Sequence, residues 1–81
     1  MDKNKFQIGD LVKWIPSRYD RQKGDTEDTG VVIEIGDTTD TKTRPLRRYA
    51  LINWAQIGRA RIICEDSSWE KTHIIARANN V

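Results

Sequence analysis

The clearest pattern in this chain is an alternation of apolar and polar positions over residues 29–35. One set of alternate positions is wholly apolar and consists of Val31, Ile33 and Ile35. The other set holds Val32 and Glu34. A period of two residues is the period of side chains on one face of a β-strand. The pattern therefore predicts a strand at 29–35, with the wholly apolar set turned into the core and the other set turned outward.

Four further short runs are rich in β-branched, aromatic and aliphatic residues, so the chain predicts five strands. They cover residues 10–15, 29–35, 48–54, 59–65 and 74–77. No apolar spacing of 3.6 residues persists for three turns, and we expect only a single helical turn, at 70–73. Residues 17–28 and 36–45 are predicted as loops. Five short strands hide their edges best by closing, so we expect an all-β, five-stranded barrel in one domain, ordered over about 8–77.

The third predicted strand carries large apolar groups on both faces. Ala50, Ile52 and Trp54 share one face, and Tyr49, Leu51 and Asn53 share the other. The strand is therefore either central and covered on both faces, or it exposes some of these apolar groups. On the fourth strand we expect the small and apolar set inward and the arginines outward. A small barrel has only one interior, so the outer apolar groups of the third strand indicate a surface for a partner. Trp14 and Trp69 are expected in the core, whereas Trp54 fits either a core or a binding role.

Composition narrows the class of protein. The chain has 81 residues, which suffices for one domain with a small core. Its single cysteine, Cys64, excludes an internal disulfide and lies in an apolar run typical of a buried thiol. No apolar stretch is long enough to span a membrane, so we expect a soluble protein. Fourteen basic and twelve acidic residues give a net charge of +2, which favours no class of partner by itself.

The order of the segments resembles that of small SH3-like barrels, over residues 8–77. The KOW module opens with Gly-Asp-x-Val and carries Lys-Gly before a second glycine; the matching positions are 9–12, 23–24 and 30. Small SH3-like proteins of tailed bacteriophages similarly read Gly-Asp-Leu-Val, Gly-x-Val-Ile, an apolar strand ending in Trp, a late Trp and a terminal Ile-Ile pair. Their pattern matches positions 9–12, 30–33, 51–54, 69 and 74–75, and so covers more of the chain.

The phage-type resemblance implies a non-enzymatic protein-interaction module, either a virion or assembly component or a factor that binds a host protein. Its place would be the host cytoplasm or the virion. The expected partner is another protein or a second copy of the chain, and not a membrane. An accessory subunit of an enzyme is a weaker alternative. The expected contact residues lie in the first loop, on the third strand and at the hairpin after it: Tyr19, Tyr49, Leu51, Trp54 and Ile57.

The KOW resemblance implies instead a nucleic-acid-binding protein, for RNA or DNA. Its contacts would come from a basic group with Tyr49 alongside, made of Arg44, Arg47, Arg48, Arg59 and Arg61. The same arginines also fit a solvated face whose charges pair with Glu34, Glu65 and Asp66 on neighbouring strands. The first loop is mixed in charge, with four acidic residues among its arginines and lysine, and acidic groups repel phosphate.

Nothing in the chain predicts catalysis. The single histidine, His73, has no cysteine or carboxylate at the spacing of metal ligands, and we expect it to be exposed or locally hydrogen-bonded. No glycine-rich phosphate loop is present, and an 81-residue barrel offers few walls that exclude water from a carboxylate pair. We predict no catalytic residue, no metal site and no cofactor.

Overall fold

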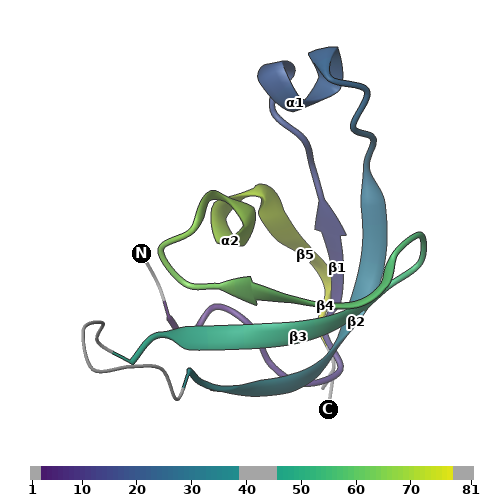
Figure 1. The fold of residues 1–81 in the computed structure, drawn as a ribbon. Coiled ribbons are helices and arrows are strands. Elements are labelled where there is room, and N and C mark those ends of the chain that lie inside the picture. Colours follow the sequence, from purple (N-terminus) through teal and green to yellow (C-terminus); the bar gives the residue numbers. More distant parts are fainter. Residues whose placement is uncertain (1–2, 39–45, 78–81) are drawn as a thin grey trace.

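The computed structural model describes residues 3–38 and 46–77 (Figure 1). Along the chain the elements are β1 (Leu11–Trp14), α1 (Arg18–Gln22), β2 (Asp28–Asp37), β3 (Arg48–Trp54), β4 (Gly58–Ile63), α2 (Ser67–Lys71) and β5 (Thr72–Ala76). All neighbouring strands are antiparallel. The predicted all-β class, with five strands and a short helix before the last one, is confirmed.

The five strands form one curved sheet in the order β4-β3-β2-β1-β5. Figure 1 shows how far the sheet curls, with α2 in the connection from β4 to β5. The two terminal strands of the sheet do not pair with each other within the described part of the chain. The sheet is therefore open, and the predicted closure into a barrel is not shown.

The core lies on the concave side of the sheet. Its buried hydrophobic side chains are Phe6, Val12, Val32, Ala50, Ile52, Trp54, Ile62, Cys64 and Trp69. Trp69 is buried as predicted, and its ring meets the ring of Phe6 edge-on with 4.8 Å between centroids. Trp54 faces the core. Trp14 is only half-buried and packs against the edge of the core, so its prediction as a core residue was wrong in part.

The predicted facing of β2 is wrong in its first half. Val31 is 40% exposed, whereas Val32 is fully buried. The register against β3 shifts between Val32 and Glu34, which places a β-bulge at Ile33. One extra residue reverses the phase of the side chains beyond it. Glu34 is therefore exposed and Ile35 packs against the core, both as predicted.

The bounds of several segments also differ from the prediction. Residues 17–28 contain α1, because Ser17 caps the helix and forms a capping box with Asp20. The helical turn expected at 70–73 lies earlier, as α2, and β5 begins two residues before the predicted 74. β2 continues to Asp37, into the expected loop. Residues 39–45 of that loop lie outside the described residues.

Candidate functional site

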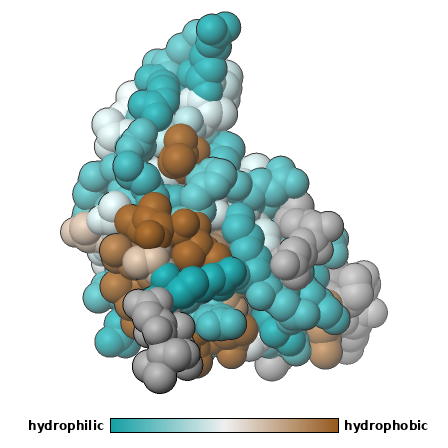
Figure 2. Space-filling model, turned by 180° about the vertical axis from the view of Figure 1, so that it is seen from behind, coloured by the Kyte–Doolittle hydropathy of each residue, from teal (hydrophilic) through white to brown (hydrophobic). Residues whose placement is uncertain are grey.

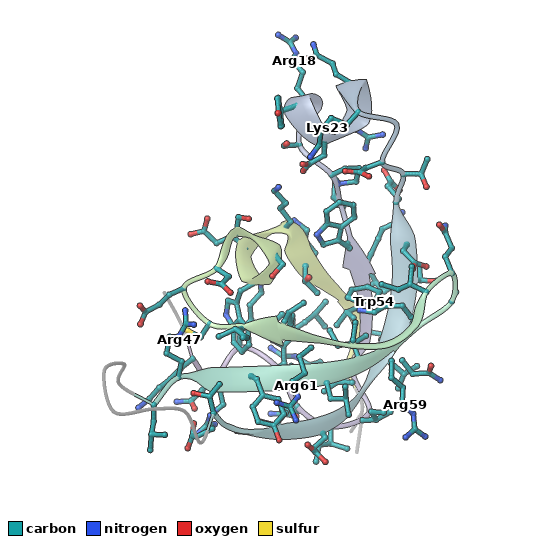
Figure 3. All side chains as sticks on the ribbon, in the orientation of Figure 1. Arg18, Lys23, Arg47, Trp54, Arg59 and Arg61 are labelled. Atoms are coloured by element: carbon teal, nitrogen blue, oxygen red, sulfur yellow. The ribbon has the colours of Figure 1, made fainter. Side chains whose placement is uncertain are left out.

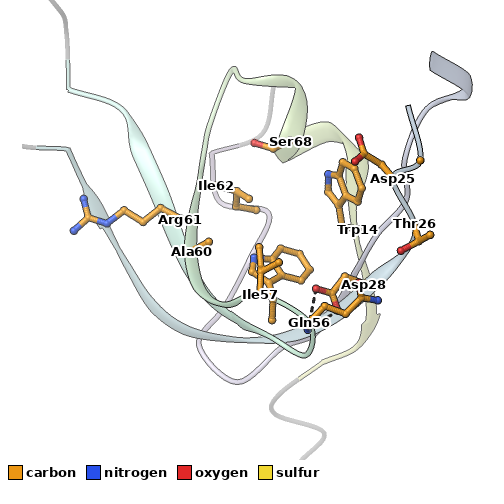
Figure 4. Close-up of a pocket in the computed structure, with 12 residues that line it drawn as sticks. Trp14, Asp25, Thr26, Asp28, Gln56, Ile57, Ala60, Arg61, Ile62 and Ser68 are labelled. Carbon is orange, nitrogen blue, oxygen red and sulfur yellow. Dashed lines mark hydrogen bonds between the residues drawn. The ribbon is translucent and has the colours of Figure 1, made fainter. Parts of the chain in front are cut away.

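A hollow of about 520 Å³ opens on the concave side of the sheet, between the end of the first loop and the β3–β4 hairpin. Figure 4 shows it in close-up. Its lining consists of Trp14, Gly24, Asp25, Thr26, Asp28, Trp54, Gln56, Ile57, Ala60, Arg61, Ile62 and Ser68. A volume between 300 and 1,000 Å³ is typical of clefts that bind ligands.

The lining of this hollow is largely apolar. Trp54 and Ile62 come from the inner faces of β3 and β4, Trp14 ends β1, and Ile57 lies in the hairpin turn with 70% of its surface exposed. The indole N–H groups of Trp14 and Trp54 donate no hydrogen bond to any residue in 3–38 or 46–77. The hollow therefore combines a largely apolar surface with a few polar groups, as clefts that bind ligands usually do.

Two aspartates, Asp25 and Asp28, line the hollow on the side of the first loop. The carboxylate of Asp28 accepts hydrogen bonds from the N–H of Thr29, at 2.8 Å, and from the N–H of Gln56, at 3.2 Å. The side-chain amide of Gln56 donates to the carbonyl of Glu27 at 2.9 Å. These bonds tie the hairpin turn to the end of the first loop, so the two walls of the hollow are held together.

The first loop is fixed at its other end by Asp20. Its carboxylate accepts a hydrogen bond from Lys71 Nζ. It also accepts hydrogen bonds from the N–H and the hydroxyl of Ser17, both at 2.9 Å. These donors, with Lys71 first, hold the pKa of Asp20 at about 2. Lys71 belongs to α2, so the bond joins α1 to the main body of the fold.

The five predicted protein-binding residues do not form one surface. Tyr19 is 67% exposed on α1, which stands away from the sheet in Figure 1. Tyr49 and Leu51 are half-buried on the outer, convex face of β3. Only Trp54 and Ile57 meet, at the hollow. The sequence reasoning missed the roles of Trp14, Asp25 and Asp28, since their place depends on how the first loop folds back.

The predicted arginine group is also dispersed (Figure 3). Arg47 pairs with Asp66 and Arg48 with Asp37, each at 3.2 Å. Arg59 and Arg61 project from the outer face of β4, opposite Asn53 and Leu51. Arg44 lies outside the described residues. Two of the arginines thus sit in ion pairs, one of them the predicted pairing with Asp66, and two remain exposed.

A small polar cluster surrounds Tyr49 on the outer face. Its hydroxyl donates to Glu34 Oε2 at 2.5 Å, and the Arg61 guanidinium lies over its ring at 4.4 Å from the centroid. The hydrogen bond to Glu34 is the main reason that the pKa of Tyr49 is raised. In Figure 4 the side chain of Arg61 extends away from the hollow, so Arg61 lines the hollow through its backbone.

The outer face also carries apolar surface, where Leu11 and Val31 pair across β1 and β2 at 37% and 40% exposure. Figure 2 shows hydrophobic side chains gathered on the back of the molecule. Among the described residues, no group of three or more histidine, cysteine, aspartate or glutamate side chains is placed to hold a metal ion. None of the helices there has the length and apolar character needed to cross a membrane.

Comparisons of this chain with family models, with curated proteins and with solved structures found no match. The resemblance to the SH3-like proteins of tailed bacteriophages therefore stays a prediction, carried by the sequence pattern alone.

Proposed function

We propose that this protein is a non-enzymatic interaction module that holds a segment of a partner protein in the hollow between the first loop and the β3–β4 hairpin. The observation that carries the proposal is the lining: the indoles of Trp14 and Trp54 and the exposed Ile57 meet in one place. Tryptophan is enriched among residues that dominate binding energy at protein interfaces. A concave apolar site with a few placed polar groups is the usual form of a peptide-sized cleft.

The biological setting follows from the resemblance. A phage-encoded module of this size would act in a virion, in its assembly, or on a protein of the host. The partner is then a viral or host protein, and the host cytoplasm or the virion is where the two meet. The hollow itself favours none of these settings over the others.

Nucleic-acid binding through the arginines has less support. Arg47 and Arg48 are already paired with carboxylates, and the acidic side chains Asp25 and Asp28 lie at the mouth of the hollow. Phosphate neutralisation by free cations supplies most of the affinity for nucleic acid. An affinity for duplex DNA that fell steeply with salt would favour this function over ours.

The test is a selection of random peptides displayed on phage, followed by NMR of the tryptophan indoles. The bound peptides are expected to shift the indole N–H signals of Trp14 and Trp54. They should leave that of Trp69 unchanged, because Trp69 is only 1% exposed and packs on Phe6. The three tryptophans of the chain thus provide their own internal control.

A pair of matched variants completes the test. Ile57→Ala is expected to weaken binding of the selected peptides about tenfold, which is the usual effect of truncating an interface residue that contributes strongly to the binding free energy. Ile75→Ala, which shortens a side chain that is 50% exposed on β5, should leave binding unchanged. Peptides that shift neither Trp14 nor Trp54, or that tolerate Ile57→Ala fully, would contradict the proposal.

A further inference from the structure

The free edge of β4 is the feature that carries a further inference. In an antiparallel pair, alternate residues exchange both backbone hydrogen bonds with the neighbouring strand, and the residues between them point the other way. The N–H of Cys64 donates to the carbonyl of Arg48 at 2.8 Å, which fixes the phase. Ile62 and Ala60 follow at steps of two and face Ala50 and Ile52. They are therefore the residues that bond to β3.

The backbone groups of Arg59 and Arg61 consequently point away from β3. β4 is the last strand of the sheet, and no strand of the described part pairs with this side of it. Ile63 is the next residue of the set that includes Arg59 and Arg61. Its carbonyl accepts a hydrogen bond from the N–H of Asp66 and not from β3, which agrees with this assignment. Two residues of β4 thus offer a full set of donors and acceptors for another strand.

The hollow runs along this same edge. Ile57, Ala60, Arg61 and Ile62 line it from the β4 side, and Trp14 and Asp25 line it from the other (Figure 4). A strand added to β4 would therefore lie at the mouth of the hollow. Its side chains would alternate between the two faces of the sheet, because successive residues of a strand point to opposite sides.

We propose that β4 accepts an extended segment of a partner protein, and that the segment carries an acidic–apolar–acidic triplet. The inference rests on the proposed function and specifies the partner of the same site. Partner residues directly opposite Arg59 and Arg61 share the outer face with the two guanidinium groups. Neither arginine has a carboxylate partner among residues 3–38 and 46–77, so both are available to acidic side chains.

The residue between the two acidic positions faces the other way, opposite Ala60, into the hollow. There it meets the apolar surface of Trp54 and Ile62. The carboxylate of Asp25 on the far wall repels an acidic side chain at this central position. The charges on the two faces therefore favour a partner segment with acidic residues opposite Arg59 and Arg61 and an apolar residue between them.

The same charges disfavour a second copy as the occupant. Two β4 strands paired antiparallel about Ala60 would set Arg59 of one copy opposite Arg61 of the other, on the same face. Like charges directly opposite each other destabilise a strand pair. Charged side chains on an exposed edge are a common device against self-pairing. The edge is thus suited to a partner of opposite charge.

The first experiment measures amide hydrogen exchange with a capped seven-residue peptide centred on glutamate–valine–glutamate. At saturation, we expect the amides of Arg59 and Arg61 to exchange at least about tenfold more slowly. The amides of Ala60 and Ile62 should change little, since they already bond to β3. A peptide centred on lysine–valine–lysine is expected to bind about fivefold more weakly or worse, as two partly exposed charge pairs contribute that much.

Two matched variants separate backbone pairing from charge. Arg61→Ala removes the charge and keeps the outward N–H, whereas Arg61→Pro also removes that N–H without breaking the ladder to β3. Arg61→Pro is expected to bind the glutamate peptide at least tenfold more weakly than Arg61→Ala. If the proline variant fails to fold, the exchange of the Arg59 and Arg61 amides in the original protein decides alone.

Unchanged exchange at both amides, or equal affinity for the two peptides, would overturn the inference. So would protection of these amides by self-association without any peptide. Selected peptides that shift the indoles of Trp14 and Trp54 while the β4 amides stay unprotected would overturn the strand pairing and leave the proposed function standing.

Discussion

Gly30 lies in β2 between β1 and β3, and replacing it with alanine tests the packing of the sheet. It pairs with Val12 on one side and with Trp54 on the other. A Cβ built there would lie 2.6 Å from Ile52 Cγ2, 2.8 Å from the carbonyl oxygen of Asn53 and 3.0 Å from the Trp54 ring. One of these contacts is with the backbone of the neighbouring strand β3, and the two side chains are buried. Neither this backbone atom nor the two buried side chains can move far enough to make room for the added methyl group.

Overpacking of this kind costs about 1–3 kcal/mol, and the cost here falls toward the upper end because a backbone atom is involved. Alanine also reduces the conformational entropy of the unfolded chain, which offsets about 0.5–1 kcal/mol of this loss of stability. We therefore expect Gly30→Ala to lower the free energy of unfolding by about 2 kcal/mol. For a domain of this size, that corresponds to a drop of about 10 °C in melting temperature. Urea unfolding followed by tryptophan fluorescence measures it.

Gly36→Ala is the matched control in the same strand. Its Cβ would lie 2.8 Å from the hydroxyl and 2.9 Å from Cε2 of Tyr49, contacts nearly as close as those at Gly30. Tyr49 is half-exposed, so its ring can swing outward at the loss of the Glu34 hydrogen bond and the Arg61 stacking. We expect a change of less than about 1 kcal/mol. Equal losses for the two variants would refute the packing argument, because only Gly30 faces atoms that cannot move.

Two further predictions concern the bonds that hold the first loop. The pKa of Asp20 is lowered to about 2 in the folded protein, chiefly by Lys71, so the stabilisation is full above the ordinary pKa near 4 and is lost as the pH falls toward 2. Thermal unfolding between pH 5 and pH 2 should accordingly show a loss that is smaller in Asp20→Asn, and an identical pH profile in the two proteins would contradict the assignment. Asp28→Ala removes the acceptor for the N–H of Gln56. Hydrogen exchange at the Gln56 amide should then be faster, while the Ile52 amide in the core stays protected. No difference at Gln56 would mean that the hairpin turn is held by other contacts.

The fold was predictable to the extent that each strand carries its own signal. β3 was predicted with its observed bounds, since residues 48–54 combine β-branched and aromatic groups between clear turn residues. The helix before β5 was expected from the short polar run that follows Trp69, residues 70–73, although it begins earlier than predicted. Closure was inferred from the general need to hide edges, and the edge of β4 is instead exposed beside the hollow.

The facing of β2 was not predictable from its alternation. The alternation over residues 31–35 favours one set of positions for the core, and the bulge at Ile33 overturns that preference for the first half of the strand. Gly30 held the missing information: it faces the core beside Trp54, so the next inward residue must be Val32. A glycine in a strand often marks such a close approach of neighbouring strands. The strand phase is better read from that glycine than from the apolar count.

The candidate site was harder to predict than the fold because it joins residues with no common sequence signal. Trp14 ends one strand, Ile57 lies in a turn and Asp25 follows a five-residue helix. Their meeting depends on the hydrogen bonds that Gln56 donates to Asp28 and Lys71 donates to Asp20, both across long sequence separations. The sequence did place arginines outward at alternate positions of β4, and that alternation is what gives the exposed edge its charge. Edge, charge and hollow coincide along one strand, and their combination limits which extended segments fit beside it.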